Sequence, residues 1–128
     1  MRVLLDTHVF LWWNEGNSEL SKRALRILTD PANTLILSVV SAWEIAIKTQ
    51  SGKLRLPEDP STYVPTRAAH YGIEFLPIHL AHALALRSLP LLHRDPFDRM
   101  LIVQSQIENL SVLTADPAIR DYAVDSIW

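Results

Sequence analysis

Residues 2–6 of the chain read RVLLD, and this short stretch decides the fold. Three of its residues, Val3, Leu4 and Leu5, form an unbroken apolar row, which is typical of a strand buried on both faces of a parallel sheet. The row ends at Asp6, a residue type that is rarely buried without a partner. We therefore predict a first strand over residues 2–5 with a carboxylate directly at its carboxyl end.

Further strand and helix segments alternate along the rest of the chain. Short apolar runs predict strands at residues 34–38 (TLILS), 73–77 (IEFLP) and 110–114 (LSVLT), and the tail AVDSIW is a candidate fifth strand. Helical spacing of apolar residues predicts helices at about residues 8–14, 18–30 with Ser18 as cap, 39–51 with Ser38 or Ser41 as cap, 61–71, 79–88 and 97–109. This alternation indicates an α/β protein with a parallel sheet of four to five strands covered on both faces.

Length and composition fit a single domain and exclude several kinds of site. The chain has 128 residues, 48% of them hydrophobic, which is enough for a buried core. It has no cysteine, so disulfides, thiolate metal sites and a cysteine nucleophile are excluded. Its three glycines lie too far apart to form a phosphate-binding loop. We expect residues 1–128 to form one domain without a dinucleotide or P-loop site.

The sequence contains no segment with the features of a signal peptide or a membrane anchor. Only three apolar residues separate Arg2 from Asp6, which is too short for a signal-peptide core. The most apolar stretch, residues 35–47, is interrupted by two serines and Glu44. We therefore expect a cytoplasmic protein that makes no membrane contact.

Four acidic residues are expected at one edge of the sheet: Asp6, Glu44, Asp98 and Asp116. Two follow predicted strands directly, and two lie in the first turns of helices that begin at the edge where ligands of parallel sheets bind. Each one alone is better explained as a helix cap, a turn residue or part of a capping box, because acids are common at helix starts. Together, four like charges require a cation, and oxygen ligands without thiolates are typical of Mg²⁺ or Mn²⁺.

Several segments of the sequence resemble the PIN-domain family: LLDTHVFLWW (4–13), SVVSAWEIAIK (38–48), GKLRLP (52–57), HRDPFDRMLI (93–102) and LTADPAI (113–119). Within that family they are most similar to the VapC-type ribonuclease toxins of toxin-antitoxin pairs. The resemblance implies a three-layer α/β/α sandwich and a metal-dependent endoribonuclease that cuts structured RNA, such as tRNA or rRNA. It also implies a homodimer, a neutralising antitoxin, and a catalytic and metal-binding role for the four acids.

The third acid of this quartet has two candidate positions. Asp98 opens a helix and is followed by Leu and Ile three and four residues later, as in the family's pattern, so we take it as the ligand. Asp95 remains open to three roles: a ligand, a cap of that helix, or a hydrogen-bond partner of a ligand. Thr7 and Thr114 adjoin two of the acids and either hydrogen-bond a carboxylate or a metal-bound water, or pack at the strand ends.

Basic residues in the same segments are candidates for RNA contact. The formal net charge is −2, and setting aside the four acids leaves +2 for the rest of the chain. Lys48, Arg94 and Arg99 are placed where they would meet RNA phosphates, although surface solvation explains them equally well.

Other functions fit the sequence less well, and its histidines and tryptophans give further expectations. A Mg²⁺-binding signalling domain needs an acid after the third strand, where the sequence reads IEFLPIH, and a non-catalytic interaction module would normally have lost one of the four acids. The histidines are spread over different elements, and His79 and His82 are expected at the surface. Because Trp12 and Trp13 point about 100° apart on a helix, they cannot both face the same core. Either one of them is exposed as an antitoxin anchor, or the second packs under a neighbouring helix.

Overall fold

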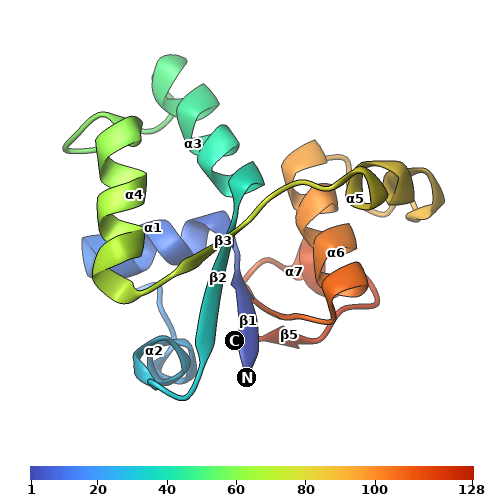
Figure 1. Ribbon diagram of the computed structural model, residues 1–128, viewed down its shortest axis with the longest axis horizontal. Coiled ribbons are helices and arrows are strands. Elements are labelled where there is room, and N and C mark those ends of the chain that lie inside the picture. The colour runs from blue at the N-terminus through green and yellow to red at the C-terminus, as the bar shows by residue number, and fades with distance from the viewer.

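The computed structural model describes residues 1–128 as a five-stranded sheet with helices on both faces (Figure 1). The strands are β1 (Arg2–Leu5), β2 (Thr34–Ser38), β3 (Glu74–Leu76), β4 (Ser111–Leu113) and β5 (Ser126–Ile127). The helices are α1 (Thr7–Glu15), α2 (Lys22–Thr29), α3 (Val39–Gln50), α4 (Pro60–Tyr71), α5 (Leu80–Ala85), α6 (Pro96–Glu108) and α7 (Pro117–Arg120), and a short 3₁₀ helix η1 (Leu86–Ser88) follows α5. The predicted α/β/α sandwich is confirmed, and none of its helices combines the length and hydrophobicity needed to cross a bilayer.

The sheet is parallel throughout and has β1 at its centre, in the order β3-β2-β1-β4-β5. Val3 of β1 pairs with Leu35 of β2 on one side and with Ser111 of β4 on the other. The chain builds one half of the sheet outward from β1 to β3 and then crosses to β4 and β5. The order therefore reverses between β1 and β4, and the carboxyl ends of these two strands flank the crevice where such sheets bind ligands.

Side chains of β1 alternate between two separate cores. Val3 and Leu5 pack in a cluster that includes Phe10 of α1, while Leu4 faces a second cluster that includes Leu101 of α6. Figure 1 shows the same division, with α1, α2 and α4 on one side of the sheet and α6 and α7 on the other. The unbroken apolar row of β1 follows from this placement, because both faces of the central strand are buried.

The structure identifies the capping residues of α2 and α3. The cap of α2 differs from the prediction, and the cap of α3 is one of the two predicted candidates. Ser21, and not Ser18, caps α2, since its hydroxyl accepts a hydrogen bond from the Ala24 amide at 2.9 Å. The prediction of Ser18 was wrong because Asn17 forms a turn ahead of the helix, in which its side chain accepts from the Glu19 amide. Of the two candidates for α3, Ser38 is the cap.

His82 is buried, which contradicts the expectation that both histidines near residue 80 lie at the surface. Helix α5 packs against α6, and the ring of His82 lies between them with no exposed surface. Its Nδ1 accepts from the His79 amide at 3.0 Å, and its Nε2 lies 3.0 Å from Glu108 Oε1. His79 itself is exposed as expected. A helix of six residues is too short for apolar spacing to show which face is covered.

The His82→Ala variant is expected to lower the free energy of unfolding by roughly 2 kcal/mol, because it leaves the Glu108 carboxylate and the His79 amide without their partner and opens a cavity. Urea unfolding measures the change. Arg87→Ala, at an exposed position in the adjoining η1, is the matched control and should unfold like the natural protein. Equal losses in the two variants would contradict a structural role for the buried ring.

Candidate active site

Asp6 lies at the carboxyl end of β1, where it is tied to the neighbouring strand β4. Its amide donates to the Leu113 carbonyl at 3.0 Å, and its Oδ2 accepts from the Thr114 hydroxyl at 2.8 Å. The side chain is almost completely buried. Burial raises the pKa of Asp6, the hydrogen bond from Thr114 partly offsets this, and the charges of Asp116 and Glu44 raise it further. Asp6 is therefore a carboxylate held in an unfavourable environment at the reversal point of the sheet.

Glu44 is equally buried, in the second turn of α3, and has two polar partners. The Thr7 hydroxyl donates to Glu44 Oε1 at 2.9 Å, and the Lys48 ammonium forms an ion pair with Oε2. Burial lowers the pKa of Lys48, but the hydrogen bond to Glu44 and the charges of Glu44, Asp95 and Asp98 outweigh burial and raise it. Lys48 therefore faces three acids and partly neutralises the site.

Asp95 caps helix α6, which is one of the three roles left open by the sequence. Its Oδ1 accepts hydrogen bonds from the amides of Phe97 at 2.8 Å and Asp98 at 3.0 Å. This cap places Asp98 in the first turn of α6.

Asp98 is mostly buried and strongly perturbed. Burial raises the pKa of Asp98 to about 6, and the charges of Asp6, Asp95 and Glu44 raise it as well, against the hydrogen bond with His93. That hydrogen bond joins His93 Nε2 and Asp98 Oδ2 at 2.8 Å. The Asp98 carboxyl group therefore interacts with the charges of three other acids.

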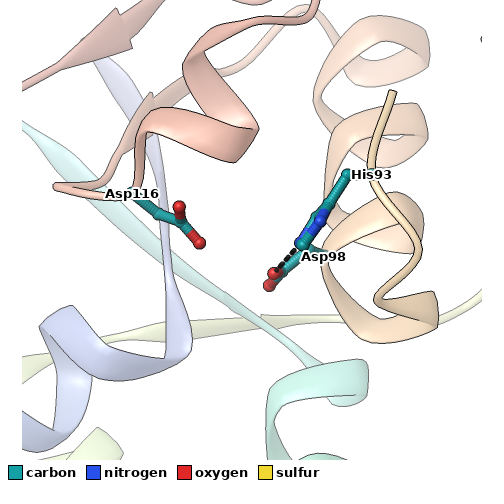
Figure 2. Close-up of side chains that lie close together, drawn as sticks. All are labelled: His93, Asp98 and Asp116. Carbon is teal, nitrogen blue, oxygen red and sulfur yellow. Dashed lines mark hydrogen bonds and ion pairs between the residues drawn. The ribbon is translucent and has the colours of Figure 1, made fainter. Parts of the chain in front are cut away.

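Asp116 approaches Asp98 from the opposite side of the crevice. It caps α7 by accepting from the Ala118 amide at 2.9 Å, and its own amide donates to Thr114 at 3.0 Å. Figure 2 shows its carboxylate directed toward Asp98 and His93. One ligand atom from each of His93, Asp98 and Asp116 lies within 4.8 Å of the other two.

His93 was missed as a site residue by the sequence reasoning, which treated the histidines as scattered. It lies in the loop before α6, five residues ahead of Asp98 and separated from it by Pro96. Its presence at the start of the segment HRDPFD was the only available signal.

Arg99 fixes the segment that precedes α6. Its guanidinium donates to the carbonyls of Leu86, Leu89 and Pro90, at 3.3, 3.2 and 2.8 Å, and to the Tyr122 hydroxyl at 3.1 Å. These bonds hold the segment that leads to His93. The expected RNA contact of Arg99 stays a prediction, as do those of Lys48, which is paired with Glu44, and of Arg94, which is exposed.

Neither Trp12 nor Trp13 is the exposed aromatic residue that the sequence suggested. Trp13 stacks on Tyr71 of α4 at 3.7 Å between ring centroids, and Trp12 packs edge-on against Trp128 at 6.0 Å. Both are partly buried because different elements cover the two sides of α1. Trp43 of α3 is the exposed tryptophan, with 52% of its surface accessible.

The residues at this edge fit a divalent cation. The carboxylates are oxygen donors of the type that Mg²⁺ and Mn²⁺ bind, and their burial near one another leaves negative charge that Lys48 alone does not balance. Burial raises the pKa values of Asp6 and Asp98, and the charges of neighbouring acids raise them further.

Comparison with known sequences assigns the family. Residues 3–125 match the profile described as the PIN domain, which covers nearly the whole chain. The chain belongs to the PIN-domain family. The acidic edge described above is therefore the candidate active site of a PIN domain.

Two curated relatives of this PIN domain are ribonucleases of Mycobacterium tuberculosis. Ribonuclease VapC22 is 27% identical over 122 residues, which cover 94% of this chain and 91% of that protein. Ribonuclease VapC16 is 42% identical over 62 residues, which cover 48% of this chain and 44% of that protein, so this match spans less than half of its length. Among solved structures, VapBC2 from Rickettsia felis bound to a promoter DNA fragment has the same fold, with a TM-score of 0.72, 12% identity and coverage of 99% and 98% of the two chains.

The Asp98→Asn variant is expected to be more stable than the natural protein when no metal is bound. Folded Asp98 keeps its proton up to about pH 6, whereas the unfolded chain releases it near the ordinary value of 3.8, so rising pH favours unfolding across this window. Removing the charge should raise the free energy of unfolding at pH 7.5 by on the order of 1 kcal/mol, and by less at pH 4.

Chemical unfolding in chelator at the two pH values measures this effect, with Asp59→Asn as the matched control. Hydrogen bonds from the Ser61 hydroxyl and amide lower the pKa of Asp59, so neutralising this exposed residue should reduce stability at pH 7.5. A destabilised Asp98→Asn protein would indicate that this carboxylate serves the fold.

Proposed function

We propose that this PIN domain is a metal-dependent endoribonuclease toxin, neutralised by a cognate antitoxin. The observation that carries the proposal is the gathering of four acids, Asp6, Glu44, Asp98 and Asp116, at the reversal point of the sheet. Its support is chemical, because buried like charges are costly and are retained where a cation uses them. The similarity to Ribonuclease VapC22 over almost the full length supports the same conclusion.

The four acids act as catalytic and metal-binding groups in this proposal. A bound Mg²⁺ or Mn²⁺ supplies an activated water and offsets charge on the phosphodiester. Thr114 orients Asp6, and Thr7 orients Glu44, through the hydrogen bonds that their hydroxyls donate. The product ends implied by the family resemblance are a 5′-phosphate and a 3′-hydroxyl.

Lys48 is proposed to guide the RNA backbone into the site. Its ammonium is partly exposed and already lies against Glu44 at the acidic edge. Together with the exposed Arg94 it provides positive charge for phosphates, which the acids would otherwise repel. The proposed substrate is structured RNA of the tRNA or rRNA class.

The partners are proposed from the named relatives and from the surface of the chain. The Rickettsia felis structure is a VapBC assembly, which supports an antitoxin as the partner of this toxin. Exposed leucines of α5 and the following loop support a homodimer: Leu80, Leu84, Leu91 and Leu92. Residues 1–128 act as a single PIN domain in this proposal, and the proposed location is the cytoplasm, where the RNA substrate is found.

RNA cleavage by the purified protein is expected to require Mg²⁺ or Mn²⁺ and to stop in EDTA, because the acids repel the phosphodiester unless a cation is bound. Gel analysis of labelled tRNA and rRNA measures cleavage. Protein carrying Asp6→Asn, purified in parallel, controls for contaminating nucleases. Full cleavage in chelator by the natural protein, absent from the variant, would refute the metal requirement.

Amide variants of the four acids should differ clearly from a variant of the helix cap. Asp6→Asn, Glu44→Gln, Asp98→Asn and Asp116→Asn should each lower kcat/KM by more than about 100-fold, which exceeds the usual effect of losing a supporting contact. Asp95→Asn should stay within about tenfold, because asparagine also caps helices. Circular dichroism controls for folding. If Asp95→Asn proved the more damaging change, Asp95 and not Asp98 would be the ligand.

A further inference from the structure

We propose that His93 is a nitrogen ligand of the metal centre, bound together with Asp98 and Asp116. This inference rests on the proposed metal-dependent function. It changes the expected ligand set from carboxylates alone to carboxylates with one imidazole.

The positions of the three side chains suit a shared ion. Their ligand atoms lie within 4.8 Å of one another, and His93 Nε2 is 2.8 Å from Asp98 Oδ2. Two adjacent ligand atoms of an octahedral ion, each about 2.1 Å from the metal, stand about 3 Å apart. The imidazole and the carboxylate therefore need to separate only slightly to bind the same ion. Figure 2 shows that Asp116 faces this pair.

The loop that carries His93 is fixed by tertiary hydrogen bonds. The hydroxyl of Tyr122 accepts from the amides of Leu92 at 3.0 Å and His93 at 2.9 Å, and donates to the Pro90 carbonyl at 2.7 Å. Arg99 donates to that hydroxyl and to the same carbonyl. A segment without helix or strand of its own is thus held by hydrogen bonds from two side chains, which is how a binding residue is pre-organised.

The two residues that hold this loop lie close in sequence to two of the proposed ligands. Arg99 is the next residue after Asp98, and Tyr122 lies two residues beyond α7, which begins after Asp116. The positions of α6 and α7 that fix the carboxylates of Asp98 and Asp116 therefore also fix the positions of the loop and the His93 imidazole. A partly exposed His–Asp pair would by itself contribute little to stability, so stability alone does not account for this support.

His8 is the other histidine near the acids, and its surroundings differ. It lines a cavity of about 250 Å³ with Asp6, Trp12 and Asp116, and its ring lies 5.8 Å from the ring of Trp12. It is exposed and does not belong to the set of mutually close ligand atoms. His8 therefore provides a matched control: an imidazole beside the site that lies outside the set of mutually close ligand atoms.

Imidazole nitrogen among carboxylates changes the expected ion preference. Magnesium binds oxygen ligands almost exclusively, whereas transition ions accept imidazole readily. The ligand set with His93 is expected to favour Mn²⁺ over Mg²⁺ more than an all-carboxylate set would. Loss of the imidazole should accordingly cost more affinity for Mn²⁺ than for Mg²⁺.

Electron spin-echo spectroscopy of bound Mn²⁺ tests the assignment without reference to activity, because a coordinated imidazole modulates the echo through its nitrogen nucleus. The natural protein and His8→Gln should show nitrogen coupling, and His93→Gln should not. Calorimetry should show that His93→Gln binds Mn²⁺ at least about tenfold more weakly. Selective ¹⁵N labelling of histidine should change the coupling pattern of the natural protein.

Absence of nitrogen coupling in natural protein that has bound Mn²⁺ overturns the assignment, and so does coupling that persists in His93→Gln. Because the first of these results needs no variant, the test does not depend on the folding of His93→Gln. Cleavage of RNA without nitrogen coupling would reject His93 as a ligand and leave the proposed function standing. Coupling in a protein that fails to cut RNA would support the ligand and reject the function.

Discussion

The mutual repulsion of carboxylates that gather at the carboxyl ends of β1 and β4 is the constraint on which the site depends. Parallel order brings the end of every strand to one edge, and the reversal between β1 and β4 opens the crevice there. Asp6 and Asp116 reach this crevice from two adjacent strands, and the Thr114 hydroxyl bonds to both residues. The fold thus concentrates negative charge at an edge where the carboxylates lie close together and are incompletely solvated, so their repulsion is only partly screened.

An ion pair and two hydrogen bonds partly offset the unfavourable free energy of this buried charge. Lys48 pairs with Glu44, Thr114 donates to Asp6, and His93 bonds to Asp98. Burial nevertheless keeps the pKa of Asp98 raised in spite of these contacts. A buried ion pair seldom repays its desolvation, and such residual strain is therefore more consistent with a binding site than with a stabilising network.

Support of the loop before α6 links the stability of the fold to the geometry of the site. The side chains of Arg99 and Tyr122 donate hydrogen bonds to backbone carbonyls of this segment. The buried ring of His82 holds α5 against α6 on the same side of the sheet. Residues that the sequence suggests as surface or RNA-binding groups are thereby used to hold the segment from α5 to His93 in place.

The sequence by itself determined the strands, most helix bounds and the edge at which the acids gather. These features follow from local rules: an apolar row such as residues 2–5 needs two covered faces, and parallel strands end at the same side. Only the tertiary structure decided that His93 joins Asp98, that His82 is buried, and that Trp13 lies under Tyr71. Apolar spacing reports which side of one element is covered, but it carries no information on which distant side chain covers it. Polar partners in loops and short helices leave no periodic signal, so their contacts exist only once the elements have packed.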